Sequence, residues 1–260
     1  MKVRIDKLLV EKGCSASRER AQALVLGGRV MVGGQKIEKP GSQVDSDACI
    51  RILGEEEKYV SRGGQKLEAA LEYWNIDLTG LCCMDVGAST GGFTDCMLQR
   101  GASSVIAVDT GHGQIDYKLR VDPRVFLLEK TNARYLKVED IYKRSESYTV
   151  TFIAMDVSFI SATLVLPAVI KAASRYETSP YLTTVILVKP QFEAGRGKVG
   201  KGGIVREPAL HQSAVERVSR SVETEGGKVI GVIESPVLGA KGNKEFLLLS
   251  KFQGDFRESD

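Results

Sequence analysis

The stretch that decides the fold is Asp85-Val86-Gly87-Ala88-Ser89-Thr90-Gly91-Gly92-Phe93-Thr94. It joins an apolar run that predicts a strand over 81–86 to a pattern that predicts a helix over 91–100. Glycines at such a junction let a ligand approach the backbone, and an open α/β sheet binds ligands at the carboxyl ends of its parallel strands. The glycine spacing departs from the GxGxxG dinucleotide fingerprint, so a nicotinamide-dependent oxidoreductase is disfavoured.

Apolar strands and helices alternate outward from this turn. Strands are predicted over residues 81–86, 104–109, 125–128, 149–155, 183–189, 228–234 and 245–250. Helices are predicted over residues 63–74, 91–100, 163–174 and 207–225. This alternation predicts an α/β domain with a doubly wound, mostly parallel sheet. No helix separates the last two strands, so we expect them to pair antiparallel.

The first 57 residues have a different pattern, which predicts a small α+β domain with a linker. Two short helices are expected, the second N-capped by Ser17 and ended by Gly27-Gly28, followed by strands over 30–32, 35–37 and 49–53. The polar run 54–58 is typical of a connector between domains. We therefore divide the chain into domains at 1–57 and 58–260.

Composition narrows the class of protein. The 260 residues are 43% hydrophobic and 27% charged, which excludes a disordered chain. The longest charge-free stretch, 157–170, is shorter than the roughly 20 apolar residues of a spanning helix. The start Met1 to Asp6 has no apolar core, so we expect no signal peptide and a cytoplasmic location. The five cysteines contain no CxxC, so we expect buried thiols and neither a disulfide framework nor a metal site.

Basic residues are concentrated at the N-terminus. Residues 1–66 hold 13 Lys and Arg against 9 Asp and Glu, whereas residues 67–260 hold 23 against 24. A modest local excess of this kind is compatible with nucleic-acid binding and equally with an ordinary solvated surface.

At residues 3–53 the sequence resembles an S4-type RNA-binding domain, through RIDKLLVEKG followed by SRERAQALVLGGRVMVGGQ. In that family the exposed face of the helix pair and the following turn lie against RNA phosphates. The resemblance implies RNA contacts from five basic residues: Arg4, Lys7, Arg18, Arg20 and Arg29.

A second glycine-rich segment, Gly195 to Lys201, satisfies GxxxxGK, but Gly202 stands where a P-loop needs Ser or Thr for magnesium. The segment also follows Pro190-Gln191-Phe192-Glu193 instead of joining a strand directly to a helix, so an NTPase is disfavoured. We expect a basic loop that binds a substrate phosphate. The RNA-binding residues expected outside the first domain are Arg62, Arg196, Lys198 and Lys201.

Across essentially its whole length the chain resembles the TlyA family, through VSRGGQKL, DVGASTGGFTD, MDVSFIS, LVKPQFEAGRGKVGKGG and GNKEFL in this order. Members of that family are S-adenosylmethionine-dependent 2′-O-ribose methyltransferases of rRNA and are often labelled haemolysin A. The resemblance implies cytidines of the small- and/or large-subunit rRNA as targets. The resemblance implies a Rossmann-like seven-stranded catalytic domain of the FtsJ type. The implied cofactor-binding residues are Asp85, Gly87, Ala88, Ser89, Thr90, Gly91, Gly92, Phe93, Asp109, Thr131 and Asn132.

Among these, Asp109 ends the second predicted strand, where its carboxylate can accept both hydroxyls of a ribose. Thr131 or Asn132 is expected beside the adenine.

The FtsJ-type catalytic pattern is a Lys-Asp-Lys-Glu tetrad, which the resemblance carries to Lys66, Asp156, Lys189 and Glu245. Methyl transfer from a sulfonium needs a deprotonated ribose oxygen and no metal. We assign Lys189 as the base, Lys66 and Glu245 to orienting the hydroxyl and the ammonium, and Asp156 to the vicinity of the methyl group. The alternative is a structural network of the same charges.

Three other functions stay open. A haemolysin is disfavoured because the sequence lacks a spanning segment and an amphipathic basic helix. A pseudouridine synthase also often couples an S4-type module to a catalytic domain, but its GRLD-type turn is absent from the sequence. A ribosome-binding protein without activity would not need the tetrad. We expect ribosomal RNA or ribosomal subunits as partners and no membrane.

Overall fold

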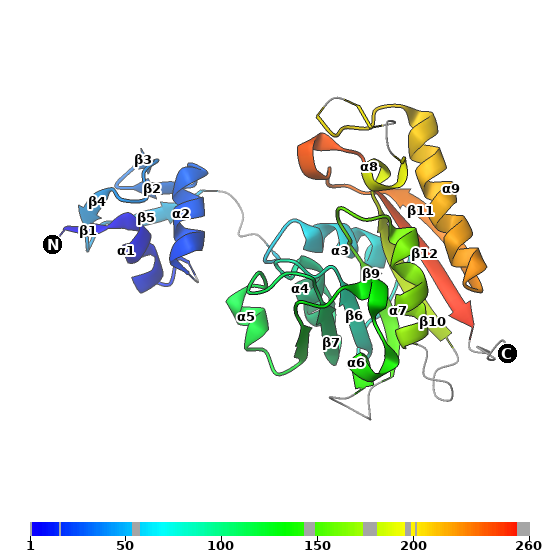
Figure 1. Cartoon of the computed structure of the whole chain (residues 1–260). Coiled ribbons are helices and arrows are strands. Elements are labelled where there is room, and N and C mark those ends of the chain that lie inside the picture. Colours follow the sequence, from blue (N-terminus) through cyan, green and yellow to red (C-terminus); the bar gives the residue numbers. More distant parts are fainter. Residues whose placement is uncertain are drawn as a thin grey trace. The chain divides into compact units, whose positions relative to one another are not determined.

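The computed structural model describes residues 2–15, 17–53, 58–142, 149–173, 181–195, 199–200 and 202–253. It divides into two compact units, residues 1–56 and 57–260 (Figure 1).

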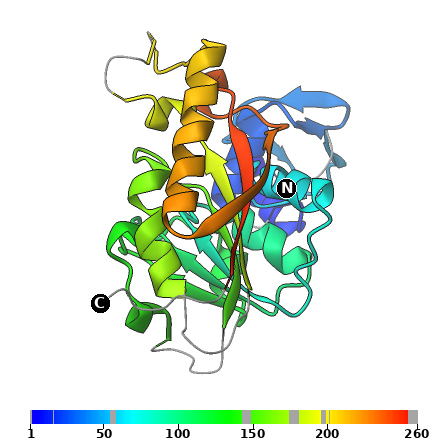
Figure 2. The ribbon, with the colours of Figure 1, turned by 90° about the vertical axis from the view of Figure 1, so that its right-hand side faces the viewer.

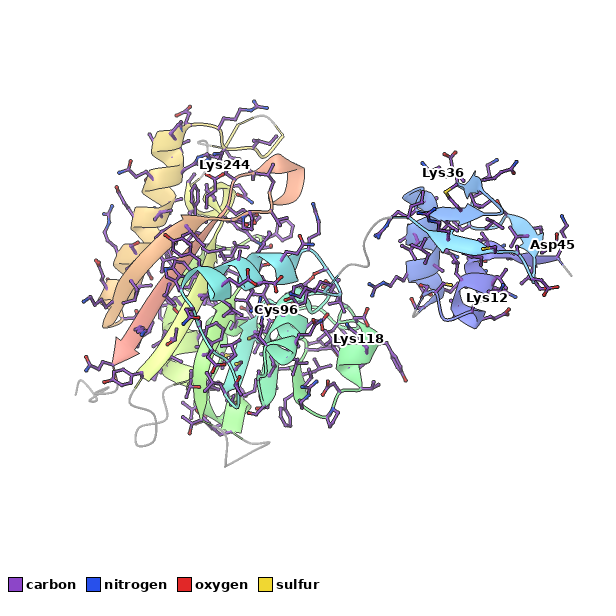
Figure 3. All side chains as sticks on the ribbon, turned by 180° about the vertical axis from the view of Figure 1, so that it is seen from behind. Lys12, Lys36, Asp45, Cys96, Lys118 and Lys244 are labelled. Atoms are coloured by element: carbon purple, nitrogen blue, oxygen red, sulfur yellow. The ribbon has the colours of Figure 1, made fainter. Side chains whose placement is uncertain are left out.

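The first unit packs two helices on short strands. Its elements are β1 (Lys2–Arg4), α1 (Ile5–Glu11), α2 (Arg18–Leu26), β2 (Val30–Val32), β3 (Gln35–Ile37), β4 (Gln43–Asp45) and β5 (Ile50–Ile52). The strands form an antiparallel sheet in the order β3-β2-β5 and a separate antiparallel pair, β1 with β4. The core contains Ile5, Leu8, Leu9, Ala21, Val25, Val30 and Val44, while Lys12, Lys36 and Asp45 lie at the surface (Figure 3).

The expected cap of the second helix is confirmed, because the Ser17 hydroxyl accepts a hydrogen bond from the Arg20 amide at 3.2 Å. The pair β1 and β4 was not predicted. Each of these strands has three residues, and they pair Val3 with Val44 across a long stretch of chain. Strands of three residues are too short to show a recognisable alternation of apolar and polar residues, so the sequence does not indicate them.

The second unit contains a seven-stranded sheet in the order β11-β12-β10-β9-β6-β7-β8. The strands are β6 (Cys82–Val86), β7 (Ser104–Val108), β8 (Val125–Leu128), β9 (Val150–Met155), β10 (Tyr181–Val188), β11 (Gly227–Glu234) and β12 (Phe246–Gln253). The inner pairs are parallel, and β12 runs antiparallel to both β10 and β11. The seven strands and the antiparallel final pair agree with the prediction.

Helices cover both faces of this sheet (Figure 2). On one face lie α6 (Val138–Tyr142), α7 (Leu166–Ala173) and α9 (Pro208–Thr224). On the other face lie α3 (Gly63–Tyr73), α4 (Gly92–Gln99) and α5 (Tyr117–Arg120). The remaining helix, α8 (Pro190–Glu193), directly follows β10. The short helices α5, α6 and α8 were not predicted, because the spacing of apolar residues that indicates a helix needs more than one turn to become visible.

The expectation of buried cysteines holds for Cys82, Cys83 and Cys96, but it is wrong for Cys49, which is exposed in the turn before β5. Cys14 is half-buried. All five thiols are free. Among the described residues, no helix combines the length and the hydropathy that crossing a bilayer requires.

Candidate active site

The glycine turn between β6 and α4 forms the floor of the candidate site. Gly87 and Gly91 have φ values of 89° and 96°, in the left-handed region that favours glycine. A Cβ atom on Gly87 would lie 2.6 Å from the carbonyl oxygen of Asp156, so no larger residue fits without moving the neighbouring loop. The turn therefore exposes backbone instead of side chains to the space above it.

Asp85 lies beneath this turn. Its side chain is fully buried, and one carboxylate oxygen accepts hydrogen bonds from the Thr94 amide at 2.8 Å and the Thr94 hydroxyl at 2.6 Å. The other oxygen has no hydrogen-bond partner among the described residues, and burial raises the pKa of Asp85 to about 7. Asp85 thus braces α4 against β6 from within the core and does not line the cavities, in contrast to the direct cofactor contact expected.

Asp109 follows β7 and connects the glycine turn to the next loop. One of its carboxylate oxygens accepts from the Ser89 amide at 2.7 Å and the other from the Gly111 amide at 2.6 Å. Each oxygen retains a lone pair, so the carboxylate can still accept two hydroxyl groups from a ligand.

Two cavities adjoin at the turn and share Gly87, Ser89 and Asp156 as lining residues. The first also contains these predicted cofactor residues: Ala88, Thr90, Gly92 and Phe93. The second contains Asp109, Thr131 and Asn132. Gly91 lines neither cavity and instead serves as the N-cap residue of α4.

The four predicted catalytic residues form two ion pairs, one buried and one partly buried. Lys66 Nζ lies 2.5 Å from Glu245 Oε2, and Lys189 Nζ lies 2.6 Å from Asp156 Oδ1. Lys66 and Lys189 are each 8% exposed and Glu245 is 2% exposed. Because Lys66 and Asp156 both line the first cavity, one member of each pair faces the same space as the glycine turn.

The fold explains how residues distant in sequence meet here. Asp156 and Lys189 follow β9 and β10, two parallel neighbours whose carboxyl ends share one edge of the sheet. Glu245 precedes β12, which runs antiparallel to β10 with Val188 opposite Phe246. The start of β12 therefore lies beside the end of β10.

Several residues of the site were not predicted. The Ser158 hydroxyl accepts a hydrogen bond from Lys189 Nζ at 2.6 Å. A Cβ atom on Gly239 would lie 1.9 Å from Glu245 Oε1, so the position of this carboxylate requires a glycine. Phe159 lines the second cavity with a φ of 65° and 92% of its surface exposed. An exposed aromatic ring in a strained backbone conformation is a feature that sequence patterns do not indicate.

The predicted RNA contacts of the first unit include two arginines that bind one buried acid. The Arg4 guanidinium donates to both carboxylate oxygens of Asp6, at 3.0 and 2.9 Å, and Arg18 Nε donates to one of them at 3.0 Å. The hydrogen bonds from Arg4 hold the pKa of Asp6 well below its usual range. The two arginine side chains stay 40% and 47% exposed, so they are oriented without being buried.

The other predicted basic residues have varied settings. Lys7 is exposed, Arg20 is half-buried on α2, and Arg29 Nε donates to the Leu53 carbonyl at 2.9 Å. Arg62 lines the first cavity. The expected phosphate-binding residues Arg196, Lys198 and Lys201 lie outside the described residues. Among the described residues, no group of three or more His, Cys, Asp or Glu side chains is placed to hold a metal ion.

Comparison with known proteins gives two family matches. Residues 59–252 match the FtsJ-like methyltransferase family, and residues 3–48 match the S4 domain. The 16S/23S rRNA (cytidine-2′-O)-methyltransferase TlyA of Mycobacterium tuberculosis is 42% identical over 98% of this chain and 91% of its own length. YqxC of Bacillus subtilis, named as an rRNA methyltransferase, is 42% identical over 99% of this chain and 88% of its own.

A solved structure of a protein described as a hemolysin from Streptococcus thermophilus is 41% identical. It aligns with a TM-score of 0.73 over 97% of this chain and 89% of that one.

Proposed function

The chain belongs to the FtsJ-like methyltransferase family, whose members depend on S-adenosylmethionine, and from this premise we propose that it methylates the ribose 2′-hydroxyl of cytidines in ribosomal RNA. The observation that carries the proposal is the two lysine–carboxylate ion pairs beside the glycine turn, of which Lys66 and Asp156 line the first cavity. The substrate follows the names of the relatives and the N-terminal S4 domain.

The described residues fit the cofactor. The glycine turn leaves a cradle that the Cβ of any other residue at 87 would fill, and Asp109 presents a carboxylate to the second cavity. We assign the adenosine end to the second cavity and the methionine end to the first, where backbone from Ala88 to Thr90 and Lys66 provides polar groups. When bound, the cofactor supplies a methyl group on a positively charged sulfonium.

Lys189 is the proposed base. Its ammonium contacts Asp156 and the Ser158 hydroxyl, two residues that line the second cavity. The lysine becomes a base only when its ammonium has lost a proton. The amine can then accept the proton of the ribose hydroxyl.

Lys66 and Glu245 act as a second, orienting pair. The ammonium of Lys66 lines the cavity, where it can donate to the ribose oxygen and stabilise its developing negative charge. Glu245 holds that ammonium at 2.5 Å and is itself confined by Gly239. A purely structural role is disfavoured, because burying ion pairs often stabilises a protein no more than apolar packing of the same volume does.

The first unit is the proposed RNA-binding module, with Arg4 and Arg18 oriented by Asp6 toward phosphates. Ribosomal subunits are the proposed partners, and their location implies a cytoplasmic enzyme. A haemolysin is the second candidate, favoured by the names of relatives and not by a feature of the described residues.

Purified protein, labelled S-adenosylmethionine and either ribosomal subunits or free rRNA would test the proposal. We expect label at ribose 2′-oxygens of specific cytidines, lost in Lys66→Ala and retained in Lys244→Ala, whose lysine pairs with Glu234 at the surface. Cofactor binding without methyl transfer to any of these RNAs would contradict the function. Leakage from pure-lipid vesicles at equal protein concentration would favour the haemolysin instead.

A further inference from the structure

A third buried carboxylate, outside the tetrad, connects the same two segments that carry Asp156 and Lys189. Glu193 ends α8, one helical turn after Lys189, and is 3% exposed. One of its carboxylate oxygens accepts the Ser161 hydroxyl at 2.5 Å and the other accepts the Ala162 amide at 2.7 Å. Both donors belong to the segment that follows β9.

The 156–162 segment is thereby fixed at both ends by the segment that follows β10. Lys189 contacts its beginning, at Asp156 and Ser158, and Glu193 contacts its end. Phe159 lies between the two contacts with a φ of 65°, a conformation that costs a non-glycine residue on the order of 1 to 3 kcal/mol. Such a conformation persists only where the surroundings determine it, and these contacts on either side of Phe159 provide that determination.

Glu193 is itself held by the layer beneath it. Arg217 of α9 donates to the Glu193 main-chain carbonyl at 2.9 Å, which ties α8 to the long helix on that face of the sheet. Burial raises the pKa of the Glu193 carboxyl, although its two donors oppose this rise. Burying the Glu193 carboxylate costs free energy, and its two hydrogen bonds come from uncharged donors. A carboxylate kept at this position despite that cost indicates a specific role for the contact.

We propose that Glu193 is a positioning residue for methyl transfer: its buried carboxylate fixes the 156–162 segment so that Asp156 and Ser158 meet the ammonium of Lys189. The inference rests on the proposed function and extends it to a residue that touches neither cavity. Catalysis is sensitive to such positioning, since a displacement of about 1 Å at reacting groups can lower a rate by about 100-fold.

Glu193→Gln and Glu193→Ala separate the hydrogen bonds from the charge. A glutamine oxygen can accept from the Ala162 amide while its nitrogen donates to the Ser161 hydroxyl, which can turn toward Thr163 at 2.7 Å. Alanine leaves both donors without this partner. Glu216→Ala, which removes a half-exposed carboxylate from α9, is the control.

The measurements are the single-turnover rate constant at saturating RNA and cofactor, the cofactor Kd, and amide hydrogen exchange of residues 157–164. We expect Glu193→Ala to lower the rate constant at saturating cofactor by about 10- to 100-fold with faster exchange, and Glu193→Gln and Glu216→Ala to stay within about threefold of wild type. Wild-type rate and exchange in Glu193→Ala would overturn the proposal, as would equal loss of rate in the glutamine variant.

If the wild-type protein binds cofactor but transfers no methyl group, the proposed function fails. The exchange measurement then decides separately whether Glu193 holds the segment, and unchanged exchange in Glu193→Ala overturns that role too.

Discussion

Replacing Lys189 by arginine separates the two properties that the proposed mechanism requires of this side chain. Arginine keeps the positive charge and can remain paired with Asp156, which Lys189 Nζ approaches to 2.6 Å. It is effectively never deprotonated in a protein, so it cannot accept a proton from the ribose hydroxyl. We therefore expect Lys189→Arg to retain cofactor and RNA affinity and to lose turnover.

The size of the loss follows from the role assigned to the amine. General-base catalysis contributes about 100- to 10,000-fold, equivalent to about 3 to 5 kcal/mol of transition-state free energy. Losing the charge as well has a different signature: Lys189→Met leaves the Asp156 carboxylate, only 22% exposed, without its cation. We expect the methionine variant to lose folding stability, whereas the arginine variant loses mainly rate.

The assay is single-turnover methylation across a pH series, with the cofactor Kd measured in parallel for each variant. The wild-type rate constant should rise with pH as the base loses its proton, and this rise should vanish in Lys189→Arg. Turnover close to wild type in the arginine variant would refute the assignment. The charge alone would then suffice, and the ribose proton would leave by another route.

Three further substitutions test the two units separately. Burial raises the pKa of Asp85 to about 7 in the folded state, so between about pH 4 and 7 the folded protein binds more protons than the unfolded one. The unfolding free energy of the wild type should therefore fall by on the order of 4 kcal/mol as the pH rises through this range. Asp85→Asn should remove this fall, which urea titrations across the pH range measure. Asp6→Ala should weaken RNA binding although it removes a negative charge, because Arg4 loses its bidentate partner; tighter binding would contradict this orientation. Gly239→Ala should lower the methylation rate at least 10-fold by displacing Glu245, and a normal rate would show that this carboxylate need not be fixed.

The strands of the second unit could be predicted because most are predominantly apolar segments of four to eight residues, and β11 alternates half-buried and exposed residues. The tetrad could be assigned because the family pattern fixes its order along the chain. The contacts around it could not, since they depend on side chains brought together by tertiary packing. Ser158 resembles any loop serine in the sequence, and only the structure shows that it accepts a hydrogen bond from Lys189.

The same limit applies to charge in the first unit. The resemblance to an S4-type domain implied RNA contacts from Arg4 and Arg18, but it did not reveal that these residues share the buried carboxylate of Asp6. A count of charges treats Asp6 as opposing RNA binding, whereas its hydrogen bonds orient two of the cations. Local sequence contains the two residue types but not their common partner.

The reversed direction of β12 completes the proposed catalytic cluster. Lys66 and Glu245 are separated by 179 positions, and they meet because β12 begins beside the end of β10. In a parallel orientation the residue before β12 would lie at the opposite edge of the sheet, about 24 Å away for an eight-residue strand. Glu245 could not then contact Lys66, and the buried ammonium would lack its counter-charge. The antiparallel final strand is therefore a requirement of the proposed chemistry as well as of the sheet.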